Sequence, residues 1–237
     1  MLHATDVGKD FGPLTALESV DISVEAGQAV CLLGANGAGK TTMMNLFLGF
    51  LRPDRGQVRV CGKDPYEEPT EARRSIAYIP ENVALYDEMT GLENLAFFDR
   101  LAGHRRSDGQ LLEYLTASGL EPAQAQRPVR AYSKGMRQKV GLAIAAAKDA
   151  RVLLLDEPMS GLDPSAARDF TSRLNDFKQE GRAVLMATHD IFRAKDCSTR
   201  IGIMKAGRLM DIVDSEQMDA LEIERVYLEH MGREAAS

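Results

Sequence analysis

Short apolar runs alternate with amphipathic segments along most of this chain of 237 residues. Uninterrupted apolar runs predict strands that are buried on both faces, and apolar residues every three or four positions predict helices. The predicted strands are Ala29–Leu33, Ile76–Ile79, 152–155, 183–187 and 201–204, and the predicted core helices span 40–50 and 164–178. Strands and helices that alternate in this way are typical of an α/β domain.

Between residues 86 and 147 the pattern changes to consecutive helices. Apolar residues at helical spacing mark three of them: Leu92, Leu95 and Ala96, then Leu111, Leu112 and Leu115, then residues 140–147. The tail shows the same spacing at Ile223, Val226, Tyr227 and Met231. We therefore expect one domain over residues 1–237, with a core of residues 1–85 and 148–215, a helical insert of residues 86–147 and a C-terminal helix of residues 216–237.

The composition suits a soluble protein with a buried core, since 44% of the residues are hydrophobic and 27% are charged. A formal net charge of −6 argues against a nucleic-acid partner, which calls for a basic surface. The local basic clusters 73–74 and 104–106 are interpreted as solvated surface.

No apolar stretch approaches the roughly 20 residues that cross a bilayer, and the N-terminus does not resemble a secretion signal. If the protein acts at a membrane, we therefore expect it to lie at the membrane surface and not to cross the bilayer. Cys31, Cys61 and Cys197 show no spacing typical of a metal site or a disulfide framework, and they are interpreted as reduced cytosolic thiols.

A glycine-rich segment lies between the strand Ala29–Leu33 and the helix that follows it. Its residues, which match the Walker A pattern GxxxxGK[ST], are Gly34, Ala35, Asn36, Gly37, Ala38, Gly39, Lys40 and Thr41. Glycines let backbone N–H groups surround phosphates, and the helix N-terminus favours anions. Lys40 is expected to reach the β- and γ-phosphates, and the Thr41 hydroxyl to bind Mg²⁺. With Thr42 included, this is the predicted nucleotide loop, although the motif alone indicates only a nucleoside triphosphate.

Two carboxylates end the apolar strand of residues 152–155. Because open α/β sheets bind ligands at the carboxyl ends of their strands, Asp156 and Glu157 are candidates for a catalytic site. Asp156 is expected to hold Mg²⁺ or its water, and Glu157 to act as general base on the attacking water. An incidental acidic turn is the alternative, and the upstream phosphate loop disfavours it.

A second helix N-terminus offers another anion site. Ser133 is a natural N-cap, and Gly135 would let the backbone approach a ligand closely. Two phosphate sites for one nucleotide are explained most simply if they face each other across a dimer. A helix whose N-cap has only a structural role, with no ligand, explains the same spacing equally well.

Residues 132–138, Tyr-Ser-Lys-Gly-Met-Arg-Gln, resemble the signature of ABC transporter ATPases, commonly Leu-Ser-Gly-Gly-Gln. Further motifs follow the family's order: Phe11 matches the aromatic residue that stacks on adenine, Glu81 lies at the Q-loop position, Asp163 ends a D-loop, and His189 matches the switch histidine. These motifs span residues 11–189, nearly the whole catalytic domain.

The resemblance implies a P-loop ABC ATPase: an α/β fold with a mixed-sheet nucleotide-binding core and an inserted α-helical subdomain. It implies a homodimer or heterodimer in which Ser133 and Gly135 of one chain face the ATP on the loop of the other. Asp163 and His189 would also contact that nucleotide. Considered alone, His189 and Phe11 are better explained as buried structural residues, and only their places in the motif order favour the functional interpretation.

The implied function is that of an ATP-binding transporter subunit at the cytoplasmic face of the cell membrane. Mg-ATP would close the dimer and hydrolysis would reopen it, and this cycle would drive a separate permease to move its substrate. Export is favoured over import as the direction of transport. Residues 78–83 and 132–138 look most like ATPases of ABC-2-type exporters, and also like that of the transporter that helps to mature nitrous-oxide reductase.

The chain departs from the family pattern at three positions. Lys134 and Met136 replace common glycine and glutamine residues of the signature, and Glu81 replaces the usual glutamine. We predict that Glu81 joins Thr41 and Asp156 at Mg²⁺; the alternatives are that it points to solvent or pairs with a permease arginine.

Two other classes of protein fit less well. A soluble ABC protein that remodels nucleic acid or ribosomes would be expected to have two ATPase domains or a long coiled-coil insertion. A GTPase switch would be expected to have an Asn-Lys-x-Asp guanine-reading motif. Neither feature is found in the sequence.

Overall fold

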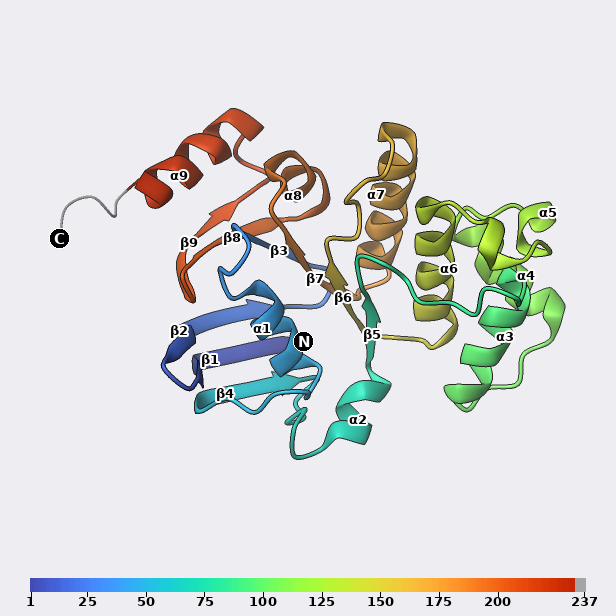
Figure 1. Cartoon of the computed structure of the whole chain (residues 1–237), viewed down its shortest axis with the longest axis horizontal. Coiled ribbons are helices and arrows are strands. Elements are labelled where there is room, and N and C mark those ends of the chain that lie inside the picture. Colours follow the sequence, from blue (N-terminus) through green and yellow to red (C-terminus); the bar gives the residue numbers. More distant parts are fainter. Residues whose placement is uncertain (233–237) are drawn as a thin grey trace.

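A computed structural model describes residues 1–232, and the strands in this part form two sheets (Figure 1). The first is antiparallel with the order β2-β1-β4, and its strands are β1 (Leu2–Phe11), β2 (Leu14–Val24) and β4 (Arg55–Val60). The second has the order β5-β6-β7-β3-β8-β9, from β5 (Ile76–Ile79), β6 (Val152–Asp156), β7 (Ala183–Thr188), β3 (Ala29–Leu33), β8 (Arg200–Lys205) and β9 (Arg208–Asp214). Its strands pair in parallel except for β8 with β9. This mixed sheet confirms the predicted α/β fold class.

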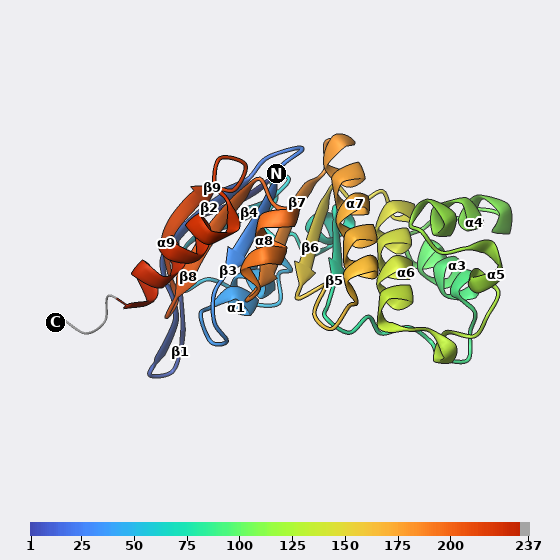
Figure 2. The same cartoon turned by 90° about the horizontal axis from the view of Figure 1, so that it is seen from above.

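The helices divide into those that cover the sheets and a consecutive group whose last helix also packs against β5. The covering helices are α1 (Lys40–Phe47), α2 (Pro69–Arg74), α7 (Pro164–Gln179), α8 (Ile191–Cys197) and α9 (Ala220–Gly232). Between β5 and β6 the chain forms α3 (Gly91–Leu101), α4 (Asp108–Ala117), α5 (Pro122–Ala125), a 3₁₀ turn (Val129–Ala131) and α6 (Lys134–Ala147). Both views place this helical group at the end of the molecule away from the three-stranded sheet (Figures 1 and 2). It has its own buried cluster, which includes Leu95, Leu111 and Val140.

The central strand β3 is buried on both faces, which explains its continuous apolar run. Val30 and Leu32 pack into the cluster shared with α1 and the three-stranded sheet. Ala29, Cys31 and Leu33 pack into the opposite cluster, which is shared with α7, α8 and α9. At roughly 25 cal/mol per Å² of buried apolar surface, such two-sided burial is the main term that stabilises the strand.

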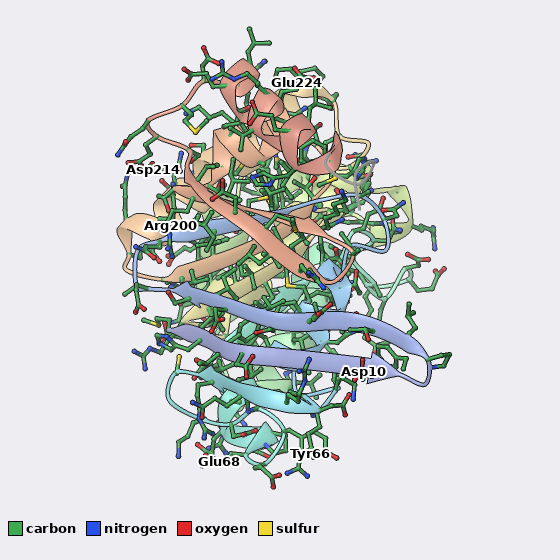
Figure 3. All side chains as sticks on the ribbon, turned by 90° about the vertical axis from the view of Figure 1, so that its left-hand side faces the viewer. Asp10, Tyr66, Glu68, Arg200, Asp214 and Glu224 are labelled. Carbon is green, nitrogen blue, oxygen red and sulfur yellow. The ribbon has the colours of Figure 1, made fainter. Side chains whose placement is uncertain are left out.

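Four strands were not predicted from the sequence, namely β1, β2, β4 and β9. β1, β2 and β4 mix buried with exposed residues, and β9 has no fully buried residue; all four carry charges on their exposed side, so none shows a continuous apolar run. Figure 3 views the three-stranded sheet from its outer side, with Asp10 near the turn that joins β1 to β2.

Two helix ends differ from the sequence prediction. Helix α1 stops at Phe47 instead of residue 50, because Gly49 adopts a φ of +68° and ends the helical path. Helix α9 begins at Ala220, because the Asp219 carboxylate accepts from the N–H of Glu222 at 2.9 Å and caps the helix there. The predicted span of residues 216–237 therefore starts too early, and residues 233–237 lie outside the described part of the chain.

No helix within residues 1–232 is long and apolar enough to span a bilayer. The three cysteines carry free thiols, and Cys31 and Cys197 are buried.

Candidate functional site

The carboxyl ends of three neighbouring parallel strands lie level with one another. In the register of the sheet, Leu33 at the end of β3 pairs with Thr188 at the end of β7, and Ala187 pairs with Asp156 at the end of β6. The phosphate loop, the two acids and His189 each follow one of these ends. The parallel topology therefore brings together motifs that lie more than 100 residues apart along the chain.

The phosphate loop is held from below by main-chain contacts. The Gly34 N–H donates to the Thr188 carbonyl at 3.2 Å. Gly39, at the N-cap of α1, has a φ of +103°, and a Cβ atom there would lie 2.8 Å from the Ala16 carbonyl oxygen. Glycine is therefore required at this position for both its conformation and its close approach to β2.

Lys40 lies beneath the loop and is only 7% exposed. Its Nζ donates to the Gly34 carbonyl at 2.6 Å and to the Ala35 carbonyl at 3.1 Å. Burial lowers the pKa of Lys40, while the nearby charges of Glu157 and Asp156 oppose this shift. The ammonium is thus fixed at the base of the loop, where an anionic ligand would neutralise it.

A cavity of about 590 Å³ opens beside the loop. Most of the residues predicted to bind nucleotide line it, namely Phe11, Asn36, Gly37, Ala38, Gly39, Lys40, Thr41 and Thr42. Its volume lies in the range of ligand pockets. Gly34 and Ala35 instead support Lys40 through their carbonyls. The sequence did not reveal the further lining residues, which are Leu14, Thr15, Ala16 and Ala206.

Phe11 is 45% exposed at the end of β1, so it is not a core residue. Its ring borders the cavity. An aromatic face in this position can stack on a planar heterocycle.

Asp156 and Glu157 lie next to each other at the end of β6, yet their surroundings differ. Burial raises the pKa of Asp156, the charge of Glu157 raises it further, and Lys40 opposes both effects. The phenol of Tyr78, on the adjacent strand β5, lies near Asp156; burial and then the Asp156 charge raise the pKa of this phenol, and the sequence did not indicate the contact.

Glu157 has a φ of +46°, which costs a residue with a Cβ on the order of 1–3 kcal/mol. Its carboxylate is held by the Thr188 hydroxyl at 2.8 Å and by Nδ1 of His189 at 2.7 Å. The side chain of His189 is 61% exposed, so it is not the buried structural histidine that its identity alone would favour.

The oxygen atoms at this edge fit Mg²⁺, which prefers a few carboxylate or hydroxyl oxygens together with phosphate oxygens. Within residues 1–232, no group of three or more His, Cys, Asp and Glu side chains could hold a metal by itself. Thr41 and the crowded Asp156 could therefore hold the ion only together with phosphate.

Ser133 caps helix α6, and its Oγ accepts from the N–H of Met136 at 3.3 Å. The residue is exposed, and within the described chain neither Ser133 nor Gly135 lines the phosphate cavity. Asp163 is likewise exposed and caps α7 by accepting from the N–H groups of Ser165 and Ala166, both at 2.9 Å. A single chain therefore does not bring these three residues to the phosphate loop.

Two of the positions that depart from the family pattern contact each other. Nζ of Lys134 lies 3.1 Å from Oε1 of Glu81, and the pair joins α6 to the loop after β5. Lys134 and then Ser160 lower the pKa of Glu81 by hydrogen bonding to its carboxylate. The buried Gln138 strengthens the same junction by donating to the carbonyls of Pro80 and Glu81 at 3.2 and 3.1 Å. Glu81 therefore does not simply point into solvent.

Comparison with known proteins agrees with this site. Residues 17–160 match the family description "ABC transporter". The uncharacterized ABC transporter ATP-binding protein YdbJ of Bacillus subtilis is 34% identical over 221 residues, which cover 92% of this chain and 71% of YdbJ. The daunorubicin resistance ATP-binding protein DrrA3 of Streptomyces coeruleorubidus is 34% identical over 214 residues, covering 90% of this chain and 67% of DrrA3.

A solved structure shows the same fold. The ATP-binding cassette MJ0796, a dimer in a post-hydrolysis state bound to ADP and Pi, superposes with a TM-score of 0.81 and 26% identity. The match covers 92% of this chain and 100% of the cassette. The site geometry and these matches together show that the chain belongs to the ABC transporter family, as an ATP-binding subunit that hydrolyses ATP.

Proposed function

We propose that two copies of this chain, or this chain and a related one, enclose two Mg-ATP molecules and drive a separate membrane permease. The observation that carries the proposal is the division of the site. One edge of the sheet holds Lys40, Asp156, Glu157 and His189, whereas Ser133 is exposed at a helix N-terminus elsewhere. A second chain would supply the missing side of each site.

The residues at the sheet edge have distinct proposed roles. The loop N–H groups and Lys40 bind the phosphates, and Phe11 stacks on the adenine. Thr41 and Asp156, with Glu81 nearby, hold Mg²⁺, which when bound neutralises charge that develops on the phosphate oxygens. Glu157 takes a proton from the attacking water as general base.

His189, Asp163 and the signature complete the proposed site. His189 can turn from Glu157 to the γ-phosphate because its side chain is exposed. Ser133 and Gly135 present the N-terminus of helix α6 to the phosphates of the partner chain. Asp163 approaches that nucleotide from the N-terminus of α7. The dimeric state of the ADP-bound cassette MJ0796 supports this arrangement.

Complementation between two variants tests the proposed sharing of sites. Ser133→Arg places a bulky cation where the signature would meet the γ-phosphate of the partner, so we expect normal ATP binding by the monomer and strongly reduced hydrolysis. Mixed with Lys40→Ala protein, it forms heterodimers with one intact site. ATPase activity should therefore reappear on mixing, to at most about half of the wild-type level.

Each variant measured alone at the same total concentration is the control for this mixture. Activity that stays at the mean of the two single variants would contradict a site built from two chains.

The proposed role of Glu81 predicts a change in magnesium dependence. Glu81→Gln removes one negative charge near Asp156 without changing the side-chain shape, so the Mg²⁺ concentration for half-maximal ATPase activity should rise about two- to fivefold. The effect is expected to be modest because Lys134 already engages the carboxylate. A Mg²⁺ titration at fixed ATP measures it.

Asp87→Asn is a matched control. Asp87 pairs at 2.7 Å with Arg137, which lies on helix α6 as Lys134 does, and no metal role is proposed for Asp87. Superimposable titrations for Glu81→Gln and Asp87→Asn would remove Glu81 from the metal site.

The permease is proposed to dock at the cytoplasmic face of the membrane on an apolar cavity of about 370 Å³ between β5 and helices α3 and α6. Tyr78, Phe98, Leu101 and Ile144 are among its lining residues, and Leu101 is 68% exposed. Because both the sheet and the helical group contribute, a partner seated here would detect their relative movement. The similarity to DrrA3 supports export as the direction of transport.

Co-purification from detergent-solubilised membranes tests this docking. The wild-type chain should retain a multi-span membrane protein, and Leu101→Glu should lose it. Leu228→Glu, on the exposed surface of α9, should keep it. Equal retention by both variants would move the docking surface elsewhere.

A further inference from the structure

The carboxyl end of β7 holds Glu157 at three consecutive residues. The Glu157 N–H donates to the Ala187 carbonyl at 2.9 Å. Oε2 of its carboxylate accepts from the Thr188 hydroxyl at 2.8 Å, and Oε1 lies 2.7 Å from Nδ1 of His189. A non-glycine residue with a φ of +46° persists only where its surroundings fix it, and here one strand end supplies all three contacts.

The Thr188 hydroxyl donates its proton to the Glu157 carboxylate. The N–H of Asp190 donates to Thr188 Oγ1 at 3.2 Å, which occupies a lone pair of the oxygen. A hydroxyl carries a single proton, and the Glu157 carboxylate can only accept. Thr188 is 3% exposed, so bulk water does not compete for this contact. The bond is therefore a charge-assisted donation from Thr188 to Glu157.

Thr188 also supports the phosphate loop through its main chain. Its carbonyl accepts from the N–H of Gly34, the first residue of that loop, at 3.2 Å. The carbonyl of Gly34 in turn accepts from Nζ of Lys40 at 2.6 Å. One buried residue thus ties the loop that holds the phosphates to the carboxylate that faces them.

The two side chains that hold the Glu157 carboxylate differ in their freedom to move. His189 is 61% exposed, and its proposed contact with the γ-phosphate requires it to release Oε1. Thr188 is buried in the strand and keeps Oε2 throughout. The contact with Thr188 is then the only one of the two that persists while water is being activated.

We propose that Thr188 is a positioning residue for ATP hydrolysis. It fixes the Glu157 carboxylate relative to the phosphate loop so that the oxygen released by His189 faces the attacking water. This inference rests on the proposed role of Glu157 as general base. It adds a residue that the sequence motifs did not single out, although a polar residue that ends an apolar strand directly before His189 is the signal that marks it.

Substitution of the hydroxyl tests the proposal. Thr188→Val keeps the shape and removes the donor, so kcat should fall about tenfold to hundredfold while KM for ATP stays within about twofold. Thr188→Ser restores the donor and should keep kcat within about threefold of the wild type. Thr188→Ala repeats the loss of the donor in case valine disturbs the strand.

Thr199→Val is the matched control. The Thr199 hydroxyl donates to the Ala29 carbonyl at 2.8 Å, at the opposite edge of the same sheet. Its loss should leave kcat within about twofold. Folded Thr188→Val and Thr188→Ala proteins with wild-type or raised kcat would overturn the proposal.

A double variant separates positioning from an independent structural role. In a Glu157→Gln background, Thr188→Val should lower single-turnover hydrolysis no further, because there is no longer a base to position. A further tenfold loss in that background would overturn the proposal. Wild-type turnover by Glu157→Gln would instead remove the role of Glu157, whereas an inactive Glu157→Gln beside a fully active Thr188→Val would remove only that of Thr188.

Discussion

Replacement of Lys40 by alanine is expected to weaken ATP binding by at least about thirtyfold. Lys40 is the cation buried beneath the phosphate loop, and the truncation of one partner of a buried charge pair typically costs about 2–5 kcal/mol of binding free energy. Isothermal titration calorimetry with Mg-ATP measures the change.

The fold should survive this substitution. The carbonyls of Gly34 and Ala35 lose a donor, at a cost of about 1 kcal/mol in the free energy of unfolding, but Gly34 keeps its N–H contact with Thr188. Lys139→Ala removes a lysine that pairs with Asp169 on the surface, and it should bind ATP normally. Equal ATP affinities for the two variants would show that Lys40 does not bind phosphate.

Replacement of Glu157 by glutamine is expected to lower the rate of ATP hydrolysis by about 10²- to 10⁴-fold, the usual contribution of a positioned general base. ATP binding should persist. The amide has the shape of the carboxylate, and its oxygen can still accept from Thr188, so the site keeps its geometry. With hydrolysis blocked, ATP should hold the dimer closed. Light scattering with and without Mg-ATP measures the dimer, and phosphate release measures the rate.

Glu157→Asp tests whether position matters as well as charge. It keeps a carboxylate but shortens the reach, so both the contact with Thr188 and that with His189 are lost or lengthened. Its rate should lie between that of the wild type and that of Glu157→Gln. Wild-type hydrolysis by Glu157→Gln would transfer the role of general base to another residue.

The structure also changes how the departures from the family pattern are understood. In the sequence, Glu81 and Lys134 are two unrelated substitutions 53 residues apart. In the fold they form one ion pair between the sheet and the helical group. Periodicity and motif spacing cannot reveal this pair, because neither reports which loops meet in space.

The fold class, the strands that are buried on both faces and the chemistry of the phosphate loop could all be predicted from the order of the residues. Ala29–Leu33 could be read directly, since two-sided burial requires an apolar residue at every position. The loop could be read because phosphate binding restricts residue types at fixed local spacing. Strands with one exposed face, such as β4, were not predicted because their apolar positions are too sparse.

How residues from distant parts of the chain act together depends on the folded arrangement. Strand register and helix packing determine three features of the site. They are the contacts of residues 187–189 with Glu157, the exposure of His189 and the placement of Ser133 away from the phosphate cavity. Register sets which strand ends lie level, and it follows from the packing of both faces of the sheet and not from any short motif. A local sequence motif is therefore enough to predict phosphate binding. Which carboxylate faces the phosphate, and which residues hold that carboxylate, depends on the fold.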